Sequence, residues 1–373
     1  IGSTGNVGIN VFNPTEKLTV AGSISADAYC SDYTNNTRFG TEALDSLSTG
    51  NDNTALGYKA LCCITTGYGN VGVGSCALRG AAAITGYGNV GIGYCAGRNI
   101  VDGTNNIVLG QNAGGSLTTG SNNVAIGGQS MSSTTASSNV GVGYGSLKTN
   151  ITGSNLVAIG SNALCKTNAY NNIAVGSIAS QCNISGEYNI AIGTCALRSN
   201  ETGECNIAIG ADAGKVTTST GSVLIGHQAG VAQTTAVNTA VGHQALANTT
   251  DGGENVAVGT QALLYNDGGY QNVAVGNSAL ASNTDGLRNT AVGCGAGYAT
   301  TTGDENVAIG YEALKCNTVN DCNVAIGSKA LYSSNGGANN VAVGTVAMYS
   351  NTTGGCNVGI GKCALYSNTT GEY

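Results

Sequence analysis

Large and small apolar residues alternate over three positions along this chain and are followed by glycine, as in Val-Ala-Ile-Gly at residues 307–310. Twenty such segments end in glycine, with a few departures from the alternation such as Thr-Arg-Phe at 37–39, and an asparagine precedes the segment in 18 copies; Leu156 and Ser222 replace that asparagine in the other two. Alternation with a period of two predicts a short β-strand, and β-branched residues at the large positions favour the same assignment. We therefore expect an all-β chain.

The glycines that end these runs are spaced almost evenly. Of the nineteen intervals between them, fourteen are 17 residues long, four are 16 and one, from Gly74 to Gly93, is 19. A period this constant over more than 300 residues predicts one small unit stacked many times. We call each repeat a rung and count its positions from the motif glycine. The motif glycines are Gly40, Gly57, Gly74, Gly93, Gly110, Gly127, Gly143, Gly160, Gly176, Gly193, Gly210, Gly226, Gly242, Gly259, Gly276, Gly293, Gly310, Gly327, Gly344 and Gly361.

The rest of each rung also follows a pattern. Alanine or serine stands three residues after the motif glycine and is usually followed by Leu, Met or Gly, and then by a turn-like stretch such as Asn-Thr-Thr-Gly at 351–354. A rung is thus predicted to be a strand, a tight turn at glycine, a second short strand and a loop. Rungs stacked about 4.8 Å apart would form a β-solenoid or β-roll of about 20 rungs, roughly 100 Å long.

The repeat divides the chain into two segments. Residues 1–30 precede it and are expected to be an N-terminal fibre connector segment with short strands, whereas residues 31–373 are expected to form the β-solenoid repeat shaft. Because the chain begins at Ile1 rather than at methionine, we expect a fragment or a processed product.

Period two also places the large apolar pair of each strand on one face and the Ala or Gly between them on the other. We expect the large pair to be buried within the rung. Burial within one rung does not offset the conformational entropy lost by 17 ordered residues, so further apolar contact is needed. The Ala/Gly face would supply it by packing closely against other copies, and we expect a parallel homotrimer.

Composition excludes several other classes of protein. The chain has 60 glycines but also numerous, regularly placed apolar residues, which argues against disorder. Its net charge is −7 and it has no Lys/Arg cluster, so we do not expect nucleic-acid binding. No apolar run approaches the roughly 20 residues of a membrane span, so we expect no membrane insertion in this fragment.

The rung motif Asn-Val-Ala-Ile-Gly-x-x-Ala resembles the head repeat of trimeric autotransporter adhesins, a resemblance that covers residues 36–373. The longer period, with Asn-Thr-Thr-Gly between rungs, is still more similar to repeats in bacteriophage and large-virus tail fibres. The opening segments 5–9 (Gly-Asn-Val-Gly-Ile) and 13–24 (Asn-Pro-Thr-Glu-Lys-Leu-Thr-Val-Ala-Gly-Ser-Ile) resemble a segment common in phage fibre proteins. These resemblances imply a parallel β-roll, left-handed in the autotransporter heads, that assembles as a trimer outside the cell or on a virion.

The leading functional hypothesis is therefore a structural virion tail-fibre shaft that mediates host attachment. Its partners would be two further copies of itself, other fibre or virion proteins, and a host surface receptor, for which a glycan is one candidate. The alternative is the head of a bacterial trimeric autotransporter-type surface adhesin. An ice-binding solenoid ranks lower because threonines cluster in loops of varying length, and an enzyme lower still because no carboxylate pair recurs at glycosidase spacing. No cofactor is expected.

Fourteen cysteines are unusual for such a chain. Cys76 and Cys95 occupy the same column of consecutive rungs, with Cα atoms expected about 5 Å apart, which is within disulfide range. Cys165 and Cys182 lie one rung apart in adjacent columns. We treat both pairs as candidate disulfides, with buried thiols as the alternative and a metal cluster not expected. Further candidate pairs are Cys195–Cys205 and Cys316–Cys322.

Two columns carry candidate binding residues. Tyr332, Tyr349 and Tyr366 occupy one column on three consecutive rungs, and such an aromatic strip either holds sugar rings of a receptor or stabilises neighbouring rungs by stacking. His227 and His243 each follow a motif glycine, one period apart. They are either exposed turn residues or, if they face a threefold axis, ligands for an ion. The asparagine column is expected to form a hydrogen-bonded ladder rather than a glycan site.

Overall fold

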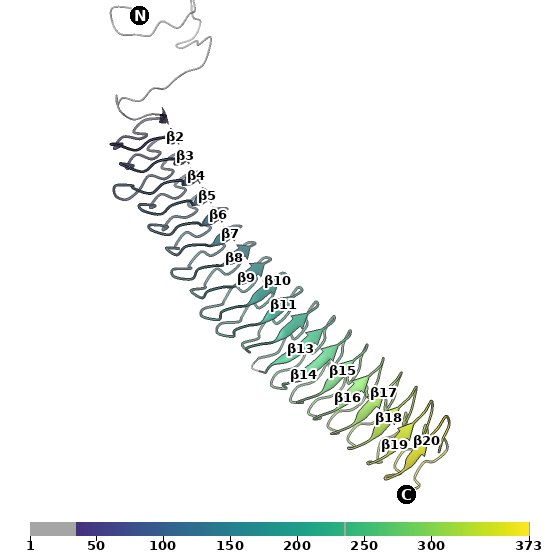
Figure 1. Ribbon diagram of the computed structural model, residues 1–373. Coiled ribbons are helices and arrows are strands. Elements are labelled where there is room, and N and C mark those ends of the chain that lie inside the picture. The colour runs from purple at the N-terminus through teal and green to yellow at the C-terminus, as the bar shows by residue number, and fades with distance from the viewer. Residues whose placement is uncertain (1–34, 235, 373) are drawn as a thin grey trace, which may run out of the picture.

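A computed structural model describes residues 35–234 and 236–372, which form one continuous coil of twenty short strands. Within these residues there is no helix, and hence none that could cross a membrane. The coil is an elongated rod with β1 near one end and β20 at the other (Figure 1). The predicted connector at residues 1–30 lies outside the described residues. The strands are β1 (Thr37–Phe39), β2 (Thr54–Leu56), β3 (Val71–Val73), β4 (Val90–Ile92), β5 (Ile107–Leu109), β6 (Val124–Ile126), β7 (Val140–Val142), β8 (Val157–Ile159), β9 (Ile173–Val175), β10 (Ile190–Ile192), β11 (Ile207–Ile209), β12 (Val223–Ile225), β13 (Asn238–Val241), β14 (Asn255–Val258), β15 (Val273–Val275), β16 (Thr290–Val292), β17 (Val307–Ile309), β18 (Val324–Ile326), β19 (Val341–Val343) and β20 (Val358–Ile360).

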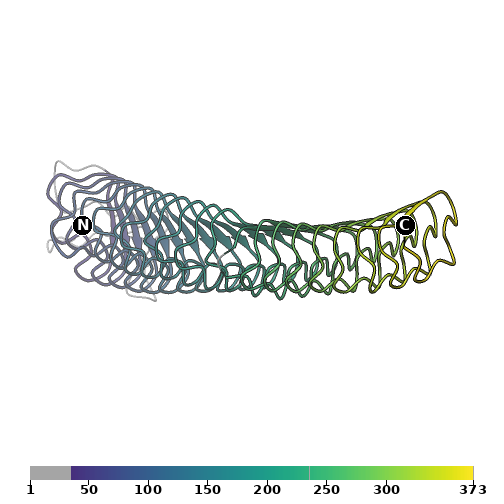
Figure 2. The same ribbon diagram turned by 90° about the horizontal axis from the view of Figure 1, so that it is seen from below.

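Each strand pairs in parallel with the strand of the next rung. Val307 lies opposite Val324, Ala308 opposite Ala325, and the same register continues from β1 to β20. The 17-residue step in sequence is therefore one full circuit of backbone, and the predicted all-β solenoid with this repeat is confirmed. The strands make a single twisted ribbon along one side of the rod, and the loops form the other side (Figure 2).

The two faces of each strand are the reverse of our prediction. The small middle residue points into the solenoid, where Ala308 is 2% exposed, while its neighbour Ile309 is 38% exposed on the outside. The interior is too narrow for a larger side chain at most rungs. A Cβ added to Gly91 would lie 2.6 Å from Cγ of Leu78, a residue of the turn that faces the strand. The Ala/Gly face is thus the core of a single chain, and other copies cannot pack against it.

Two rungs show how this narrow core balances size. Val108 and Leu224 replace the small strand residue and are both fully buried. Glycine replaces the usual leucine beside each of them: a Cβ on Gly114 would lie 3.0 Å from Cγ1 of Val108, and one on Gly230 would lie 2.7 Å from Cδ2 of Leu224. A large residue on one wall therefore requires a small one on the other, because the core is packed at solid density.

The predicted second strand of each rung does not form. The residues after the motif glycine instead make a run of turns in which left-handed backbone recurs, as at Glu312 (φ 51°) and Leu314 (φ 53°). Ladder hydrogen bonds between rungs persist, since Leu314 N–H donates to Ala330 O at 2.9 Å. The alternating conformation turns the leucine inward, so that it packs against the small residues of the strand.

The motif glycine is fixed by its neighbours in adjacent rungs. Gly310 has φ of 132°, a conformation that side-chain-bearing residues rarely adopt. A Cβ at this position would lie 2.6 Å from the carbonyl carbon of Gly327 in the next rung. Both the backbone angle and the close stacking of rungs therefore require glycine.

The predicted asparagine ladder is present and links consecutive rungs, with one interruption at Leu156, which has no side-chain oxygen to accept from the next rung. Asn306 N–H donates to Oδ1 of Asn289 at 2.9 Å, and Oδ1 of Asn306 accepts from the N–H of Asn323 at 3.0 Å. Nδ2 of Asn306 donates to Asn320 O at 2.8 Å on the opposite wall. The preceding residue, Glu305, has left-handed backbone (φ 57°). At this bend the N–H of Asn306 has no backbone acceptor in the neighbouring rung, and the side-chain oxygen of Asn289 accepts its hydrogen bond instead. The ladder is buried, and its hydrogen bonds are satisfied within the chain.

Candidate interaction surface

The largest exposed apolar feature is the outside of the strand ribbon, which we call the outer sheet face. It consists of the first and third of the three residues that precede each motif glycine, almost all Val or Ile, with Thr, Leu or Phe at a few rungs. Their side chains are half-buried or exposed, the third residue usually more so: Ile192 is 38% exposed and Ile92 is 42% exposed. A continuous apolar stripe of this kind is a mark of an interaction site on a soluble protein.

Two columns of residues border the outer sheet face. The residue before each ladder asparagine forms the leading edge, and the residue two positions after each motif glycine forms the trailing edge. Both columns have left-handed backbone, for example at Asp52 (φ 54°) and Lys59 (φ 54°). Their members are mostly polar, charged or cysteine. The apolar stripe is therefore framed by polar edges, which is the usual anatomy of a protein interface.

Ion pairs run along these edges between consecutive rungs. Arg288 pairs with Glu305 at 2.8 Å on the leading edge, and Lys59 with Glu42 at 3.2 Å on the trailing edge. Glu312 contacts both Lys315 and, at 3.6 Å, Lys329. A hydrogen bond from Lys315 is the main cause that lowers the pKa of Glu312. These acids are thus compensated within the chain.

The tyrosine column forms the stack that the sequence predicts. The ring centroids of Tyr332 and Tyr349 are 5.1 Å apart and those of Tyr349 and Tyr366 are 5.3 Å apart, with nearly parallel planes. Nζ of Lys315 and of Lys329 lies 5.6 and 5.7 Å from the Tyr332 centroid. Both faces of Tyr349 are covered by its neighbours, so a sugar ring has no free face there. The geometry supports the stabilising role, and receptor binding at these residues remains a prediction.

The two histidines are also stacked, with ring centroids 5.3 Å apart, and both are exposed. Beside them the side chains of Gln228, Gln244 and Gln261 form a hydrogen-bonded ladder at 3.0 and 3.2 Å. Across residues 35–234 and 236–372, no group of three or more His, Cys, Asp or Glu side chains is arranged to hold a metal ion. An ion at His227 and His243 would therefore require ligands from other copies.

The thirteen described cysteines are all free thiols, including Cys76, Cys95, Cys165 and Cys182, so their predicted pairing remains a prediction. Cys30 lies outside the described residues. Burial raises the pKa of Cys165 and, together with a hydrogen bond to the adjacent Cys63 thiol, raises that of Cys62 to about 12. The Sγ atoms of Cys62 and Cys63 are 3.4 Å apart.

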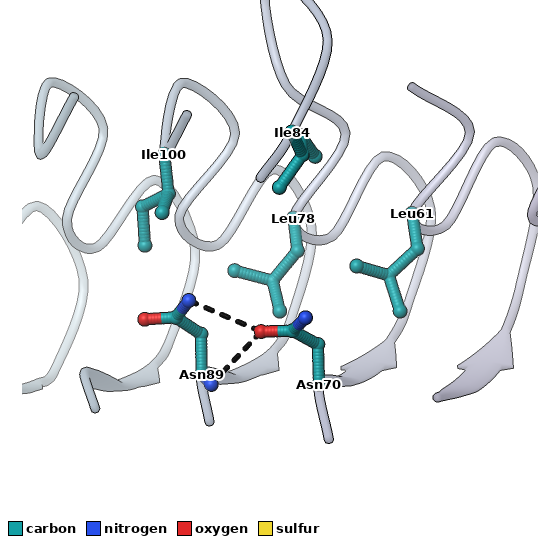
Figure 3. A pocket seen from close by; sticks show the side chains of 6 residues that line it. All are labelled: Leu61, Asn70, Leu78, Ile84, Asn89 and Ile100. Atoms are coloured by element: carbon teal, nitrogen blue, oxygen red, sulfur yellow. Dashed lines mark hydrogen bonds between the residues drawn. The ribbon is translucent and has the colours of Figure 1, made fainter. Parts of the chain in front are cut away.

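The interior offers no room for a ligand in the part of the coil around the 19-residue rung. Leu61, Leu78, Ile84 and Ile100 fill the space above the ladder residues Asn70 and Asn89 (Figure 3). Outside, the same rung borders a surface hollow of about 380 Å³ that the sequence did not reveal. Its lining is Glu42, Asp45, Ser46, Lys59, Cys62, Cys63, Arg79, Gly80 and Ala81.

No protein-family model matches this chain, and no curated protein is significantly similar to it. Function must therefore be argued from the surface itself. Sequence reasoning missed the outer sheet face, because the residue pattern did not show that leucines fill the core opposite the strands. Where leucine faces a strand across a thin coil, as Leu78 faces Gly91, the position that alternates between Ala and Gly has to be the inner one.

Proposed function

We propose that this protein is the shaft of an elongated homo-oligomeric fibre, with three parallel copies packed through the outer sheet face. The observation that carries the proposal is that half-buried or exposed apolar side chains continue along the outer sheet face, Phe39 and Leu56 on the first two strands and mostly Val and Ile from β3 to β20. Twenty rungs at about 4.8 Å spacing, each roughly 10 Å wide, give a stripe of roughly 1,000 Å². In a trimer this stripe is shared between two neighbours, so each copy covers roughly 1,000 Å² in total, which compares with roughly 800 Å² per partner in a standard stable interface.

A second copy of the chain is the partner that fits this stripe. The stripe repeats at every rung, and only a surface with the same spacing matches it over the full length. Closed assemblies of identical chains are also the commonest kind of oligomer. The trimer is preferred over a dimer because the rung motif resembles repeats of trimeric fibres and adhesin heads.

The biological role that follows is attachment, as the shaft of a virion tail fibre that holds a receptor-binding end away from the particle. The repeat supplies length, and three chains present each surface feature three times, so that weak contacts with a host surface receptor add through effective concentration. Other fibre or virion proteins would join the shaft at its ends. The resemblance of residues 5–24 to phage fibre segments favours this role over the alternative, the head of a bacterial autotransporter-type adhesin.

The assembly is tested by light scattering of the purified chain. We expect a trimer, and we expect Ile309→Lys combined with Ile326→Lys to reduce it to monomers, because two consecutive rungs of the outer sheet face would then carry buried charges. Thr302→Lys with Val319→Lys is the matched control on the loop side, where both residues are exposed. A monomeric parent protein, or equal effects of the two double variants, would contradict the proposal.

The attachment role needs a separate test. Antibodies against the shaft are expected to label the tails of virions in electron micrographs, and the purified trimer is expected to reduce virion adsorption to host cells. Labelling of a bacterial surface instead would favour the adhesin alternative.

A further inference from the structure

Two exposed cysteines border the outer sheet face at the same rung. Cys356 lies on the leading edge and Cys363 on the trailing edge, on either side of β20 (Val358–Ile360). Both are exposed, and both have left-handed backbone (φ 59° and 60°). In residues 35–234 and 236–372, this is the only rung with a thiol on both edges.

These two thiols have no partner within their own chain among the described residues. A three-residue strand alone separates the two edges by about 10 Å, whereas bonded cysteines have Cα atoms less than about 7 Å apart. On the preceding rung the same columns hold Asn339 and Val346, which carry no sulfur. Within residues 35–234 and 236–372, no thiol of the same chain lies in these columns on the neighbouring rung, and a second chain is the source of a partner thiol that we consider.

The symmetry of a closed assembly supplies that thiol. In a ring of identical parallel chains, equivalent residues lie at the same height along the axis, and all strands run in the same direction around it. The trailing edge of one copy then meets the leading edge of the next copy at the same rung. Cys363 of one copy faces Cys356 of its neighbour.

The same rule gives acceptable contacts at other rungs. At the opposite end of the shaft it brings Asp52 toward Lys59 of the next copy, a pair of opposite charges. At the rung of Gly310 it brings together two acids, Glu305 and Glu312, but each is already paired with a cation of its own chain. Charge thus permits this register along the shaft.

We infer that Cys356 and Cys363 form disulfides between neighbouring copies and close the C-terminal described rung into a covalent ring. This inference rests on the homo-oligomer proposed above and adds a redox-dependent lock to it. One bond forms at each interface, so a trimer would contain three.

The chemistry is thiol–disulfide exchange with a low-molecular-weight disulfide, such as oxidised glutathione. The thiolate of Cys363 attacks one sulfur of the oxidant, forming a mixed disulfide and releasing one reduced glutathione. The thiolate of Cys356 from the neighbouring copy then attacks the mixed disulfide and releases the second. Two protein thiols are oxidised, one disulfide of the oxidant is reduced to two thiols, and their protons pass to the released glutathione or to water.

Two other cysteines serve as matched controls. Cys205 and Cys322 are exposed on the same leading edge, but the trailing-edge residues of their rungs are Asp212 and Lys329. They have no thiol at the same height and are not expected to form cross-links. Exposure of a cysteine alone therefore does not predict a disulfide between copies. The disulfide is predicted only where the leading and trailing edges of the same rung both carry a thiol.

The test is to incubate the purified chain with oxidised glutathione, block free thiols, and run denaturing gels without reductant. We expect a band of three chains that dithiothreitol converts to one, that disappears in Cys356→Ser and in Cys363→Ser, and that persists in Cys322→Ser. Peptide mapping of a mixture of ¹⁴N- and ¹⁵N-labelled protein, mixed before assembly, should give a Cys356–Cys363 peptide pair containing both labels. That result shows a bond between chains.

Light scattering under reducing conditions separates this inference from the proposed function. An assembly that forms without any Cys356–Cys363 cross-link would contradict the inferred disulfides but not the proposed homo-oligomeric fibre. A monomer would overturn both. Cross-links through Cys205 or Cys322 in equal yield would also overturn the inference, because they would show unselective oxidation.

Discussion

Gln233 donates a hydrogen bond from Nε2 to Oγ of Ser222 at 2.8 Å, at one of the two rungs where the ladder asparagine is absent. Gln233 is fully buried, and its Nε2 also donates to Ala236 O on the opposite wall. Its Oε1 accepts from Nδ2 of Asn238 at 3.2 Å. A glutamine in the next turn of the coil thus takes over the contact across the core that asparagine makes elsewhere.

This substitute amide predicts a large loss of stability in Gln233→Leu. The change would leave the Ala236 carbonyl with only a long contact of 3.5 Å from Ser222 Oγ, and a buried group that loses its partner costs about 1–3 kcal/mol. It would also remove one of the two acceptors of Asn238 Nδ2, which would keep its bond to Gly252 O. Thermal unfolding followed by circular dichroism should show the midpoint fall. Gln271→Leu, at an exposed edge position, should change it little.

A double variant that restores the ladder asparagine should make Gln233 unnecessary. Ser222→Asn combined with Gln233→Asn recreates the arrangement of Asn306 and Asn317, whose Nδ2 atoms both donate to Asn320 O. This double variant should recover most of the stability that Gln233→Leu loses. If it unfolds at the same temperature as Gln233→Leu, then the stabilising effect of Gln233 does not come from replacing the amide that the ladder asparagine supplies at other rungs.

The motif glycine gives a second prediction. Gly310→Ala would place a methyl group 2.6 Å from the backbone of Gly327 and would force an unfavourable φ, so we expect destabilisation by about 3 kcal/mol or more. Gly128→Ala is the control, because its nearest contact would be the Tyr144 ring at 3.4 Å. Urea unfolding of the two variants should differ clearly, and similar midpoints would contradict this account.

The size balance in the core gives a third prediction. Leu224→Ala should cost about 2–5 kcal/mol, because Gly214 and Gly230 leave nothing to fill the cavity. Adding Gly214→Leu restores the arrangement of other rungs and should recover part of this loss, since Gly214 already has the left-handed φ (55°) that leucine adopts at Leu314. Unfolding of the single and double variants measures the coupling. If the destabilisation by Leu224→Ala and that by Gly214→Leu simply add in the double variant, the sizes of residues 214 and 224 are not coupled across the core.

The sequence specified the period, the strands and their register because these depend on spacing alone. The 17-residue interval places Val307 opposite Val324 whatever the rest of the rung does, and the stacking of Tyr332 on Tyr349 follows from the same interval. Features that repeat in register can therefore be predicted column by column.

The features we predicted wrongly depend on the width of the coil. Period two separates Ala308 from Ile309 but does not say which of them is inside. The answer comes from the opposite wall, where Leu314 adopts left-handed backbone and fills the core, a conformation that the pattern of residues gave no reason to expect. The outer sheet face, and with it the proposed interface, could be identified only once this wall was known.

Buried and exposed thiols should differ sharply in reactivity, which gives the last prediction. The pKa of Cys62 is raised to about 12, mainly by burial and further by the Cys63 thiol, so at pH 8 only about one molecule in ten thousand carries the reactive thiolate. Iodoacetamide at pH 8 should therefore modify the exposed Cys356 readily and Cys62 very slowly. Raising the pH should speed the reaction of Cys62 about tenfold per unit up to its pKa, as long as the chain stays folded. Mass spectrometry of digests taken over time, with circular dichroism at each pH, measures both rates. Equal rates for Cys62 and Cys356 at pH 8 would show that the Cys62 thiol is not held neutral by its surroundings.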